Sequence, residues 1–489
     1  MDEFELNLQV PAATAALLLA EFRRRGARRV HLQAHYHDTA DDLLALRGLS
    51  LRLRKEGRRW VQTLKASTDN ALRRGEDNIS LVVPNGTQPQ LDAARHVDGA
   101  ASAALCKALA DLPAPSPLVE RCATDVWRHR CEVQLPEALI EVALDIGTIR
   151  AKGAGVPICE VEFELKQGRA APLFDWARSW VGEGGLWLNT VSKAQRGLML
   201  ARGEPFAAPV KAAVPHLHAR LGGAMVLRSA VGAALEQVLA NASALAAGST
   251  QAEHLHQLRV GLRRVRTALR ELGPLGEAID ANWERLLART FEALGRIRDL
   301  DTTLQTVAPL LHDAGAPAFE WPTAPPSRSA QEIVRERGFQ QVLIDLLGFT
   351  SSQSAAASPV DVKAAIGARL AKLDDQVRRA AKRFASLPSA DQHQVRKRLK
   401  RLRYLAEFVT TLYKRDAVHR FVECLEPAQD ALGRHNDIAV AAAFFRREAE
   451  RDPRALFAAG FLQAHLKWTA HEAGSALRKA LKAPRFWQR

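Results

Sequence analysis

The 489-residue sequence predicts a multidomain protein of the α+β class, whose first part is built on strands and whose second part is all α-helical. Within residues 1–202, several short segments alternate charged and apolar residues, which is the period of a β-strand. Residues 218–489 instead form long segments rich in Ala, Leu and Arg at helical period, and these segments contain an internal repeat. We expect the Ala- and Pro-rich residues 203–217 to link the two domains.

The strand-like segments each place their charged residues on one face. Residues 3–7 read Glu-Phe-Glu-Leu-Asn, residues 51–54 read Leu-Arg-Leu-Arg, and residues 160–166 alternate Glu with apolar residues before Lys166. A single strand of this kind is usually half-buried, with its charges in water. Here three strands share the pattern with complementary signs. Carboxylates on some strands and guanidiniums on another suit a cavity that holds a divalent cation together with a polyphosphate.

The order of these segments resembles the CYTH superfamily of triphosphate tunnel metalloenzymes over about residues 1–202. The family opens with Glu-x-Glu-x-Lys; here Glu3 and Glu5 match, and Asn7 stands where the lysine belongs. The other motifs follow in the family's order, namely Tyr36-His37-Asp38-Thr39, Arg52 with Arg54, the segment from Trp60 to Lys65, Thr124-Asp125 with Arg128, Asp145, Glu160 with Glu162, and Ser192-Lys193. No single motif is specific, but the ordered set is.

The resemblance implies a fold and a reaction. The fold is an eight-stranded antiparallel β-barrel tunnel with flanking helices, for which residues 12–25, 100–112 and 172–181 are amphipathic candidates. The reaction is the hydrolysis of inorganic triphosphate (tripolyphosphate) to pyrophosphate and phosphate. It would require Mg²⁺ or Mn²⁺, bound by the carboxylates of Glu3, Glu5, Asp145, Glu160 and Glu162. The triphosphate would be bound by Arg52, Arg54, Lys65, Arg128 and Lys193. The catalytic residues would be Glu3, Glu5, Lys65 and Lys193.

Asn7 leaves other functions open. An asparagine offers two hydrogen-bond donors but no positive charge in place of the lysine ammonium. The change weakens triphosphate binding, misplaces the attacking water, or is compensated by Lys166 or Arg54. Alternatively, the protein is a non-catalytic polyphosphate-binding scaffold, or an enzyme acting on an organic triphosphate such as thiamine triphosphate or ATP. Because the other motif positions are intact, we expect that hydrolysis is retained.

The helical part contains two copies of one pattern, at residues 218–349 and 360–483. A His-Gln-x-Arg segment begins at His256 and again at His393, and a Leu-Gly-Arg-x-x-Asp segment follows at Leu294 and at Leu432. Hydrophobic periodicity predicts four helices per copy, near residues 218–247, 252–273, 276–313 and 328–349, then 360–386, 388–414, 417–448 and 453–483. We therefore expect two duplicated four-helix bundles.

Basic residues occupy one face of the repeated helix in each copy, at spacings of three and four. A solvated helix face usually mixes charges, but this face has almost no acid. The pattern resembles the CHAD domain, a helical domain that binds inorganic polyphosphate, over about residues 218–489. The resemblance implies that polyphosphate is bound by His256, Arg259, Arg263, Arg266, Arg270, His393, Arg396, Lys397, Lys400 and Arg403.

Charge also separates the two parts of the chain. Residues 1–210 contain 27 Lys and Arg against 26 Asp and Glu, whereas residues 211–489 contain 42 against 28. A basic helical domain favours a polyanionic partner. Polyphosphate is favoured over nucleic acid, because the chain has three tyrosines and no basic strand with interleaved aromatic residues for base stacking. We expect no membrane partner, and the sequence leaves the oligomeric state open.

Cysteine content and the first residues bear on location. The five cysteines show no Cys-x-x-Cys spacing, which argues for a reducing compartment and against a zinc site. The apolar run at residues 12–20 is too short to span a bilayer and follows an acidic start. We therefore expect a cytoplasmic protein. His31, His35 and His37 lie close in sequence but lack a partnering Cys/His set, so we expect a local role in a strand rather than a metal site.

Overall fold

The computed structural model describes residues 2–67, 73–84, 87–111, 117–181, 185–218, 220–276, 278–317, 328–352 and 361–488, apart from the side chains of residues 2–3, 73–74 and 298–305. The chain divides into two compact units. The sheet unit consists of Met1–Val210, Glu236–Leu258 and Val334–Ser352. The helical unit consists of Lys211–Leu235, Arg259–Ile333 and Gln353–Arg489.

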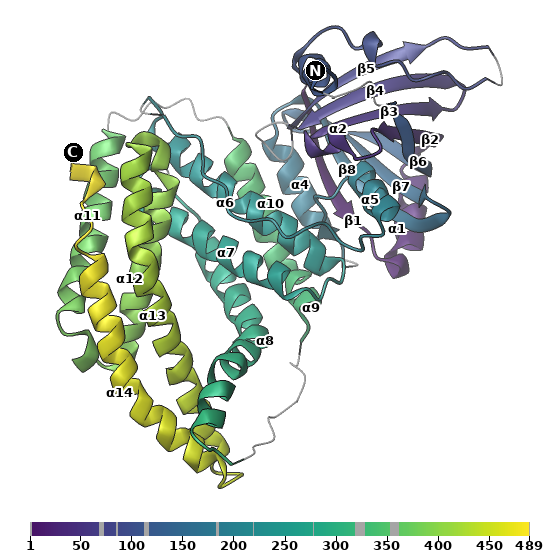
Figure 1. The fold of residues 1–489 in the computed structure, drawn as a ribbon. Coiled ribbons are helices and arrows are strands. Elements are labelled where there is room, and N and C mark those ends of the chain that lie inside the picture. Colours follow the sequence, from purple (N-terminus) through teal and green to yellow (C-terminus); the bar gives the residue numbers. More distant parts are fainter. Residues whose placement is uncertain are drawn as a thin grey trace. The chain divides into compact units, whose positions relative to one another are not determined.

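One antiparallel sheet is the centre of the sheet unit (Figure 1). Its strands, within the described residues, are β1 (Asp2–Gln9), β2 (Arg28–Asp38), β3 (Leu49–Glu56), β4 (Arg59–Ser67), β5 (Arg73–Leu81), β6 (Val119–Leu135), β7 (Ala138–Ala151), β8 (Ala154–Gly168) and β9 (Trp187–Leu188). They lie in the order β5-β4-β3-β2-β6-β7-β8-β1-β9. The first strand also pairs with β5 at three positions near its start.

The sheet confirms the strands expected at residues 3–7, 51–54 and 160–166, which fall in β1, β3 and β8. The α+β class is likewise confirmed. The eight-stranded barrel is not confirmed, because the described sheet has nine strands: β9 pairs with β1 through Leu8↔Leu188 and Gln9↔Trp187.

Helices accompany the sheet, and those within the described part of residues 1–210 are α1 (Ala12–Arg24), α2 (Leu43–Leu46), α3 (Ala100–Ala110), α4 (Ala171–Trp180) and α5 (Lys193–Arg202). The three helices that the sequence predicts here correspond to α1, α3 and α4 within two residues at each end. The helix α5 is an addition to the prediction. The helix α10 (Arg337–Ser351) also belongs to the sheet unit, where its Gln340 side chain accepts a 2.8 Å hydrogen bond from the Leu188 amide.

Alternation along the strands separates an apolar face from a charged face. In β3, Leu51 is buried in a cluster that includes Leu105 of α3, whereas the guanidinium of its neighbour Arg52 donates a hydrogen bond to Tyr36 in the lining of a cavity. In β1, the ring of Phe4 packs edge-on against Phe174 of α4, with 5.6 Å between the ring centroids. Helices thus cover apolar residues of the sheet, and the charged residues are left to line the cavity.

The chain after residue 220 is mainly helical (Figure 1). Besides α10, its long helices within the described residues are α6 (Gly223–Ala246), α7 (Ala252–Leu272), α8 (Ala281–Asp313), α11 (Val362–Ala381), α12 (Ser389–Phe408), α13 (Arg415–Glu448) and α14 (Ala455–Ala480), and a short helix α9 covers Ala330–Val334. The eight predicted helices correspond to the eight long ones. The largest difference is the start of α10, at Arg337 rather than near residue 328, because the short helix α9 precedes it; α12 also ends early, at Phe408, where a 3₁₀ turn (Thr410–Leu412) follows.

Two predictions about the domains stay open. The two units divide α6 and α7 between them, and α10 belongs to the sheet unit. The predicted boundaries at residues 202 and 218, and the grouping of the helices into two four-helix bundles, therefore stay predictions.

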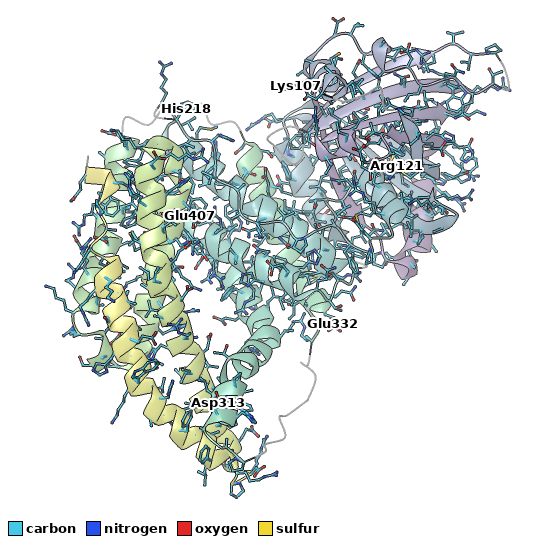
Figure 2. The ribbon with its side chains drawn as sticks, viewed as in Figure 1. Lys107, Arg121, His218, Asp313, Glu332 and Glu407 are labelled. Atoms are coloured by element: carbon cyan, nitrogen blue, oxygen red, sulfur yellow. The ribbon has the colours of Figure 1, made fainter. Side chains whose placement is uncertain are left out.

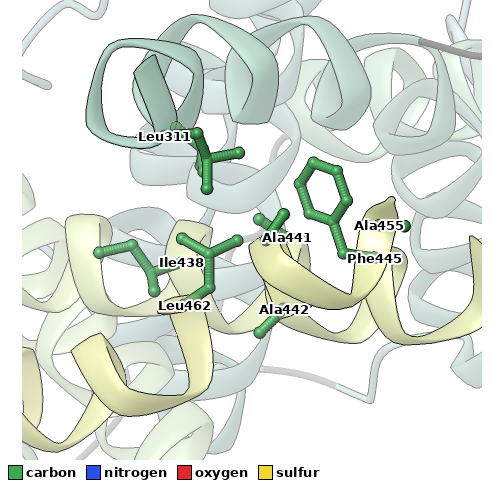
Figure 3. Packing of buried hydrophobic residues seen from close by; sticks show 9 residues of the cluster. Leu311, Ile438, Ala441, Ala442, Phe445, Ala455 and Leu462 are labelled. Atoms are coloured by element: carbon green, nitrogen blue, oxygen red, sulfur yellow. The ribbon is translucent and has the colours of Figure 1, made fainter. Parts of the chain in front are cut away.

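Part of the core of the helical unit lies between three helices (Figure 3). Leu311 of α8 packs against Phe445 of α13 and Leu462 of α14, all three buried. Small residues such as Ala441 and Ala455 complete this cluster. Alanine at the contact allows the helix backbones to approach closely, which fits the Ala-rich composition of α13 and α14.

Among the helices of the described residues, α6 alone is long and apolar enough to cross a membrane by length and composition. In the structure, 67% of its apolar window is buried inside the protein, as in the core helix of a folded domain.

Candidate functional site

A cavity of about 370 Å³ lies in the sheet unit, lined mainly by strands of the sheet and by the first turns of α5. It brings together most of the predicted site residues of residues 1–202, namely Glu5, Arg52, Arg54, Lys65, Arg128, Asp145, Glu162 and Lys193. Glu160 is not part of the lining, but its carboxylate contacts the Lys193 ammonium. The side chain of Glu3 lies outside the described residues, so its predicted role stays a prediction.

The lining also includes charged residues that the sequence analysis did not single out, among them Glu76, Arg121, Arg130, Glu141 and Glu164. The period of a strand could have found three of them. Arg130 follows Arg128 by two residues, Glu164 follows Glu162 by two, and Glu141 precedes Asp145 by four, so each shares a face with a predicted residue.

Three carboxylates form the acidic side of the site. Asp145 on β7 is the Cα partner of Glu160 on β8, and Glu162 is the next residue of β8 on the same face. One oxygen from each of Asp145, Glu160 and Glu162 lies within 4.8 Å of the other two. We call these residues the carboxylate triad. Carboxylate oxygens at this spacing fit a hard divalent cation such as Mg²⁺ or Mn²⁺.

Three cationic side chains surround the carboxylate triad. The Lys193 Nζ lies 2.8 Å from the Asp145 carboxylate and 2.5 Å from that of Glu162, and it also contacts Glu160. Arg128 donates two hydrogen bonds of 2.7 Å to Asp145 and a further one to Glu162. The third cation, Arg196 of α5, donates to Glu160. The triad is therefore charge-balanced by residues of the chain itself.

These contacts set the ionisation of the site. Burial alone would lower the pKa of Lys193 and of Arg128, but the neighbouring carboxylates outweigh burial and raise both pKa values well above their ordinary range. Burial would raise the pKa of Glu162, yet the charges of Arg128 and Lys193 hold it well below its usual value. The same two cations lower the pKa of Asp145. All four groups are therefore charged at neutral pH.

A second set of cations lies on β3 and β4. Arg52 donates to the Tyr36 hydroxyl at 3.3 Å, and both Arg52 and Lys65 lie near the carboxylate of Glu76, at 3.9 and 3.6 Å. Arg54 pairs with Glu56, and burial followed by the charge of Arg52 lowers the pKa of Arg54. Because these cations end long side chains that line the cavity, they suit the oxygens of a polyphosphate.

Asn7 lies on β1 and lines the cavity. Its Nδ2 donates a 3.0 Å hydrogen bond to Glu5, whereas its Oδ1 is buried and has no hydrogen-bond partner among the described residues. In the pairing of β1 with β8, Asn7 is the Cα partner of Glu162. The two residues that could compensate for the missing lysine, Lys166 and Arg54, both line the cavity as well.

The Tyr-His-Asp-Thr motif has a structural role in its second half. The buried Asp38 carboxylate accepts hydrogen bonds from the amides of Thr39, Leu44 and Ala45, at 2.7, 2.8 and 2.9 Å. Burial raises the pKa of Asp38. Nearby, Arg121 (labelled in Figure 2) donates to Asp42 at 2.7 Å. These bonds fix the chain between β2 and β3, while Tyr36 faces the cavity.

Lys193 is held in place by the start of α5. Ser192 caps the helix: its hydroxyl accepts from the Gln195 amide at 3.2 Å, and the Gln195 side chain accepts from the Ser192 amide at 3.0 Å. One turn later, Gly197 packs against the buried Cys122, where an added Cβ would lie 2.9 Å from the Cys122 Cβ. The first residue of α5 is thus fixed relative to the sheet.

In the helical unit, basic residues from both repeats affect the pKa of Lys400. The pKa of Lys400 on α12 is lowered to about 6, first by burial and then by the charges of Arg263 on α7 and Arg396 on α12. Arg259 contributes in the same direction, and Asp437 opposes it. We call Arg259, Arg263, Arg396 and Lys400 the basic cluster. It joins residues that the sequence analysis assigned to separate copies of the repeat.

Other predicted polyphosphate ligands are held by ion pairs. Arg266 and Arg270 both contact Glu284, at 2.9 and 3.1 Å, and Arg403 contacts Glu407 at 2.7 Å. His393 shares a 2.9 Å hydrogen bond with Asn436, Lys397 is exposed, and His256 is half-buried. Among the predicted ligands, Arg263, Arg396 and Arg259 are thus the ones whose charges lower the pKa of Lys400.

Residues 1–198 match the family model of the CYTH domain, and residues 229–446 match that of the CHAD domain. Among curated proteins, the inorganic triphosphatase of Haemophilus influenzae is 30% identical over 207 residues, which are 41% of this chain and 55% of that protein. The chain therefore spans about half the length of this curated relative.

Two solved structures are similar to parts of the chain. The CHAD domain from the plant Ricinus communis is 23% identical with a TM-score of 0.45, and the match covers 57% of this chain and 98% of that domain. A Hippeastrum protein, named as an adenylyl cyclase with a dominant triphosphatase activity, is 16% identical with a TM-score of 0.28. This second match covers 41% of this chain and 96% of that protein.

Proposed function

Because residues 1–198 belong to the CYTH family and residues 229–446 form a CHAD domain, we propose that this protein hydrolyses inorganic triphosphate to pyrophosphate and phosphate in the cavity of the sheet unit. The reaction requires a divalent cation, Mg²⁺ or Mn²⁺. The CHAD domain binds inorganic polyphosphate. The proposal includes a tunnel-like barrel around the cavity, which the pairing of β1 with β5 supports, and residence in the cytoplasm.

The observation that carries the proposal is a cavity that combines clustered carboxylates with several cationic side chains. The carboxylate triad lies on β7 and β8, while Arg52, Arg54 and Lys65 extend from β3 and β4. A triphosphate needs both the cationic side chains and the carboxylates, since cations must neutralise its oxygens and a metal ion must lie next to its reacting phosphorus. The cavity volume of about 370 Å³ falls in the range of about 300–1,000 Å³ that is typical of small-molecule sites.

The cavity residues have separate roles in the proposed reaction. Arg52, Arg54 and Lys65 bind and orient the phosphate oxygens. The carboxylate triad, with Glu3 and Glu5, holds the cation, which when bound supplies a Lewis acid to the phosphoryl oxygens. A cavity carboxylate positions the attacking water. The water oxygen bonds to the terminal phosphorus as the bridging P–O bond breaks, so pyrophosphate leaves with the electron pair and phosphate is the second product.

Asn7 favours a second candidate function. Its Oδ1 has no hydrogen-bond partner among the described residues, and the site has one cation fewer than a CYTH motif with lysine. A cavity of this kind binds triphosphate without rapid turnover if the lost charge is not replaced. The protein would then act as a polyphosphate-binding scaffold. An organic triphosphate, such as thiamine triphosphate or ATP, is the further alternative.

Phosphate release tests these candidates directly. The full-length protein is assayed with tripolyphosphate, ATP and thiamine triphosphate, each with Mg²⁺, Mn²⁺ or a chelator. We expect release from tripolyphosphate that stops when the cation is removed. Faster release from an organic triphosphate would assign that substrate instead. Binding of tripolyphosphate without release from any substrate would favour the scaffold.

A further inference from the structure

The ammonium of Lys193 occupies the centre of the carboxylate triad. Its Nζ is 2.8 Å from Asp145 and 2.5 Å from Glu162, and it also contacts Glu160. These are the same three carboxylates whose oxygens lie within 4.8 Å of one another. A Mg²⁺ ion would need those oxygens at about 2.0–2.1 Å. The ammonium and a divalent cation therefore cannot both occupy this position.

We propose that Lys193 is an internal competitor of the divalent cation: it occupies the cation's position in the carboxylate triad, and cation binding displaces it towards the triphosphate. The inference rests on the proposed function, because it assigns Lys193 a second partner in the same cavity. This role differs from that of a fixed triphosphate ligand, because the Lys193 side chain then has two alternative positions.

The position of Lys193 on α5 allows this exchange. Its backbone is held by the Ser192 cap and by the close packing of Gly197, so the helix itself need not move. The side chain is an unbranched stem of four carbons that carries the charge at its end. Arg128 is different, because its two hydrogen bonds to Asp145 match the geometry of a carboxylate. Of the two, Lys193 is the cation that a metal ion can displace.

The exchange has a thermodynamic consequence. Without a divalent cation, the Lys193 ammonium contacts three carboxylates, two of which are almost completely buried. A divalent cation must replace these contacts, so it binds weakly on its own. When triphosphate is present, the released ammonium gains a new anionic partner. Cation and triphosphate then each strengthen the binding of the other, as linkage requires.

The test measures cation binding without turnover. Mn²⁺ is titrated into the full-length protein at pH 7.5 without triphosphate, and free Mn²⁺ is followed by electron paramagnetic resonance. We expect Lys193→Met to bind Mn²⁺ about tenfold more tightly than the wild type, because hydrogen bonds to charged groups no longer have to be broken. The matched control is Lys166→Met, which removes the same charge from the same cavity but from a lysine paired with Glu164 at 2.7 Å.

Comparison of the two variants distinguishes displacement of the Lys193 ammonium from an effect of the net charge of the cavity. Little change in Lys166→Met, with a gain in Lys193→Met, supports the proposal. An equal gain in both variants would overturn it, because the effect would then be one of net charge. Unchanged or weaker Mn²⁺ binding in Lys193→Met would overturn it as well.

Folding is monitored in the same samples. Loss of the ammonium leaves the carboxylate triad with less positive charge, so Lys193→Met and the milder Lys193→Gln should melt at lower temperature without Mn²⁺. Mn²⁺ should raise the melting temperature of both variants more than that of the wild type, and a smaller rise would contradict the proposal. Phosphate release from tripolyphosphate is measured in parallel. Its absence in the wild type would refute the proposed function, whereas the comparison of Mn²⁺ affinities would remain valid.

Discussion

The guanidinium of Arg264 on α7 lies 2.5 Å from the carboxylate of Glu407 on α12. A second ion pair joins the same helices in the opposite direction, from Arg401 on α12 to Glu271 on α7 at 2.9 Å. Arg264 is 1% exposed and also stacks on the ring of Phe408 at 4.6 Å. The repeated helices of the helical unit are thus tied together by reciprocal ion pairs.

Removing Arg264 should destabilise the helical unit. Arg264→Ala removes the ion pair with Glu407, which keeps Arg403 as a second cation, and also the packing on Phe408. Because hydrogen bonds to charged groups contribute about 1.5–3 kcal/mol, we expect the free energy of unfolding to fall by about this amount in urea titrations of the full-length protein. The exposed Lys397→Ala on the same helix pair is the control and should change it by less than about 0.5 kcal/mol. Equal effects would show that the pair is not important for stability.

Replacing Glu162 should abolish cation-dependent hydrolysis. Glu162 belongs to the carboxylate triad and lines the cavity. Its loss should reduce phosphate release from tripolyphosphate by at least about 100-fold, since a metal ion contributes several kcal/mol to the transition state. Glu162→Ala is compared with Glu132→Ala, which removes an exposed carboxylate of β6 outside the cavity lining. Unchanged turnover in Glu162→Ala would remove this residue from the metal site.

Asn7→Lys tests the missing charge. A lysine at this position would place an ammonium beside Glu5 and opposite Glu162, in a cavity that binds a polyanion. We expect a lower KM for tripolyphosphate, a higher kcat, or both, measured by steady-state phosphate release. Asn7→Met has a similar length without charge and serves as the control. A loss of both binding and turnover in Asn7→Lys would mean that the site has adapted to the asparagine.

Charge reversal in the basic cluster should weaken polyphosphate binding. The double variant Arg263→Glu with Arg396→Glu should lose at least about tenfold in affinity for long-chain polyphosphate, and the remaining binding should depend less on salt. The control is Arg420→Glu with Arg447→Glu, which makes the same charge change at exposed positions of α13. Binding is followed by fluorescence anisotropy at several salt concentrations. Equal losses in both double variants would indicate a diffuse electrostatic field instead of a defined site.

Lys400 should make stability depend on pH. Its pKa is lowered to about 6 in the folded protein, against an ordinary value of 10.5. Between these two values the unfolded chain binds the proton and the folded chain does not, so the free energy of unfolding rises with pH across this window. Lys400→Met should remove part of this rise between pH 6.5 and pH 9, as measured by urea unfolding. An unchanged slope would mean that Lys400 is protonated in the folded protein.

The part of the site that could be predicted is the part that depends on the local alternation of residues along a strand. Arg52, Arg54 and Glu162 were found because a strand alternates its faces, and the face of a strand does not depend on distant contacts. In the helix α7, Arg264 follows Arg263 directly and so lies about 100° around the helix from it, in agreement with its separate, buried ion pair. Its partner Glu407 lies 143 residues later and gives no local signal.

Long-range contacts explain what could not be predicted. Lys193 is a predicted triphosphate ligand, and in the structure its ammonium lies among carboxylates from β7 and β8. The assignment of α10 to the sheet unit depends on contacts such as that of Gln340 with the Leu188 amide. Neither contact can be read from periodicity, because each joins elements that are far apart in the chain.

Gly197 determines how closely α5, and with it Lys193, approaches the sheet. It lies one helical turn after Lys193, so the two residues share a face of α5, and its missing Cβ lets the helix approach Cys122 closely. Any larger residue at position 197 would push α5 outward and shorten the reach of the Lys193 ammonium. The affinity for the cation would then change without the loss of a single charged group. A contact between a glycine and a cysteine, neither of which lines the cavity, would thus act as a spacer that sets the balance between the Lys193 ammonium and the divalent cation.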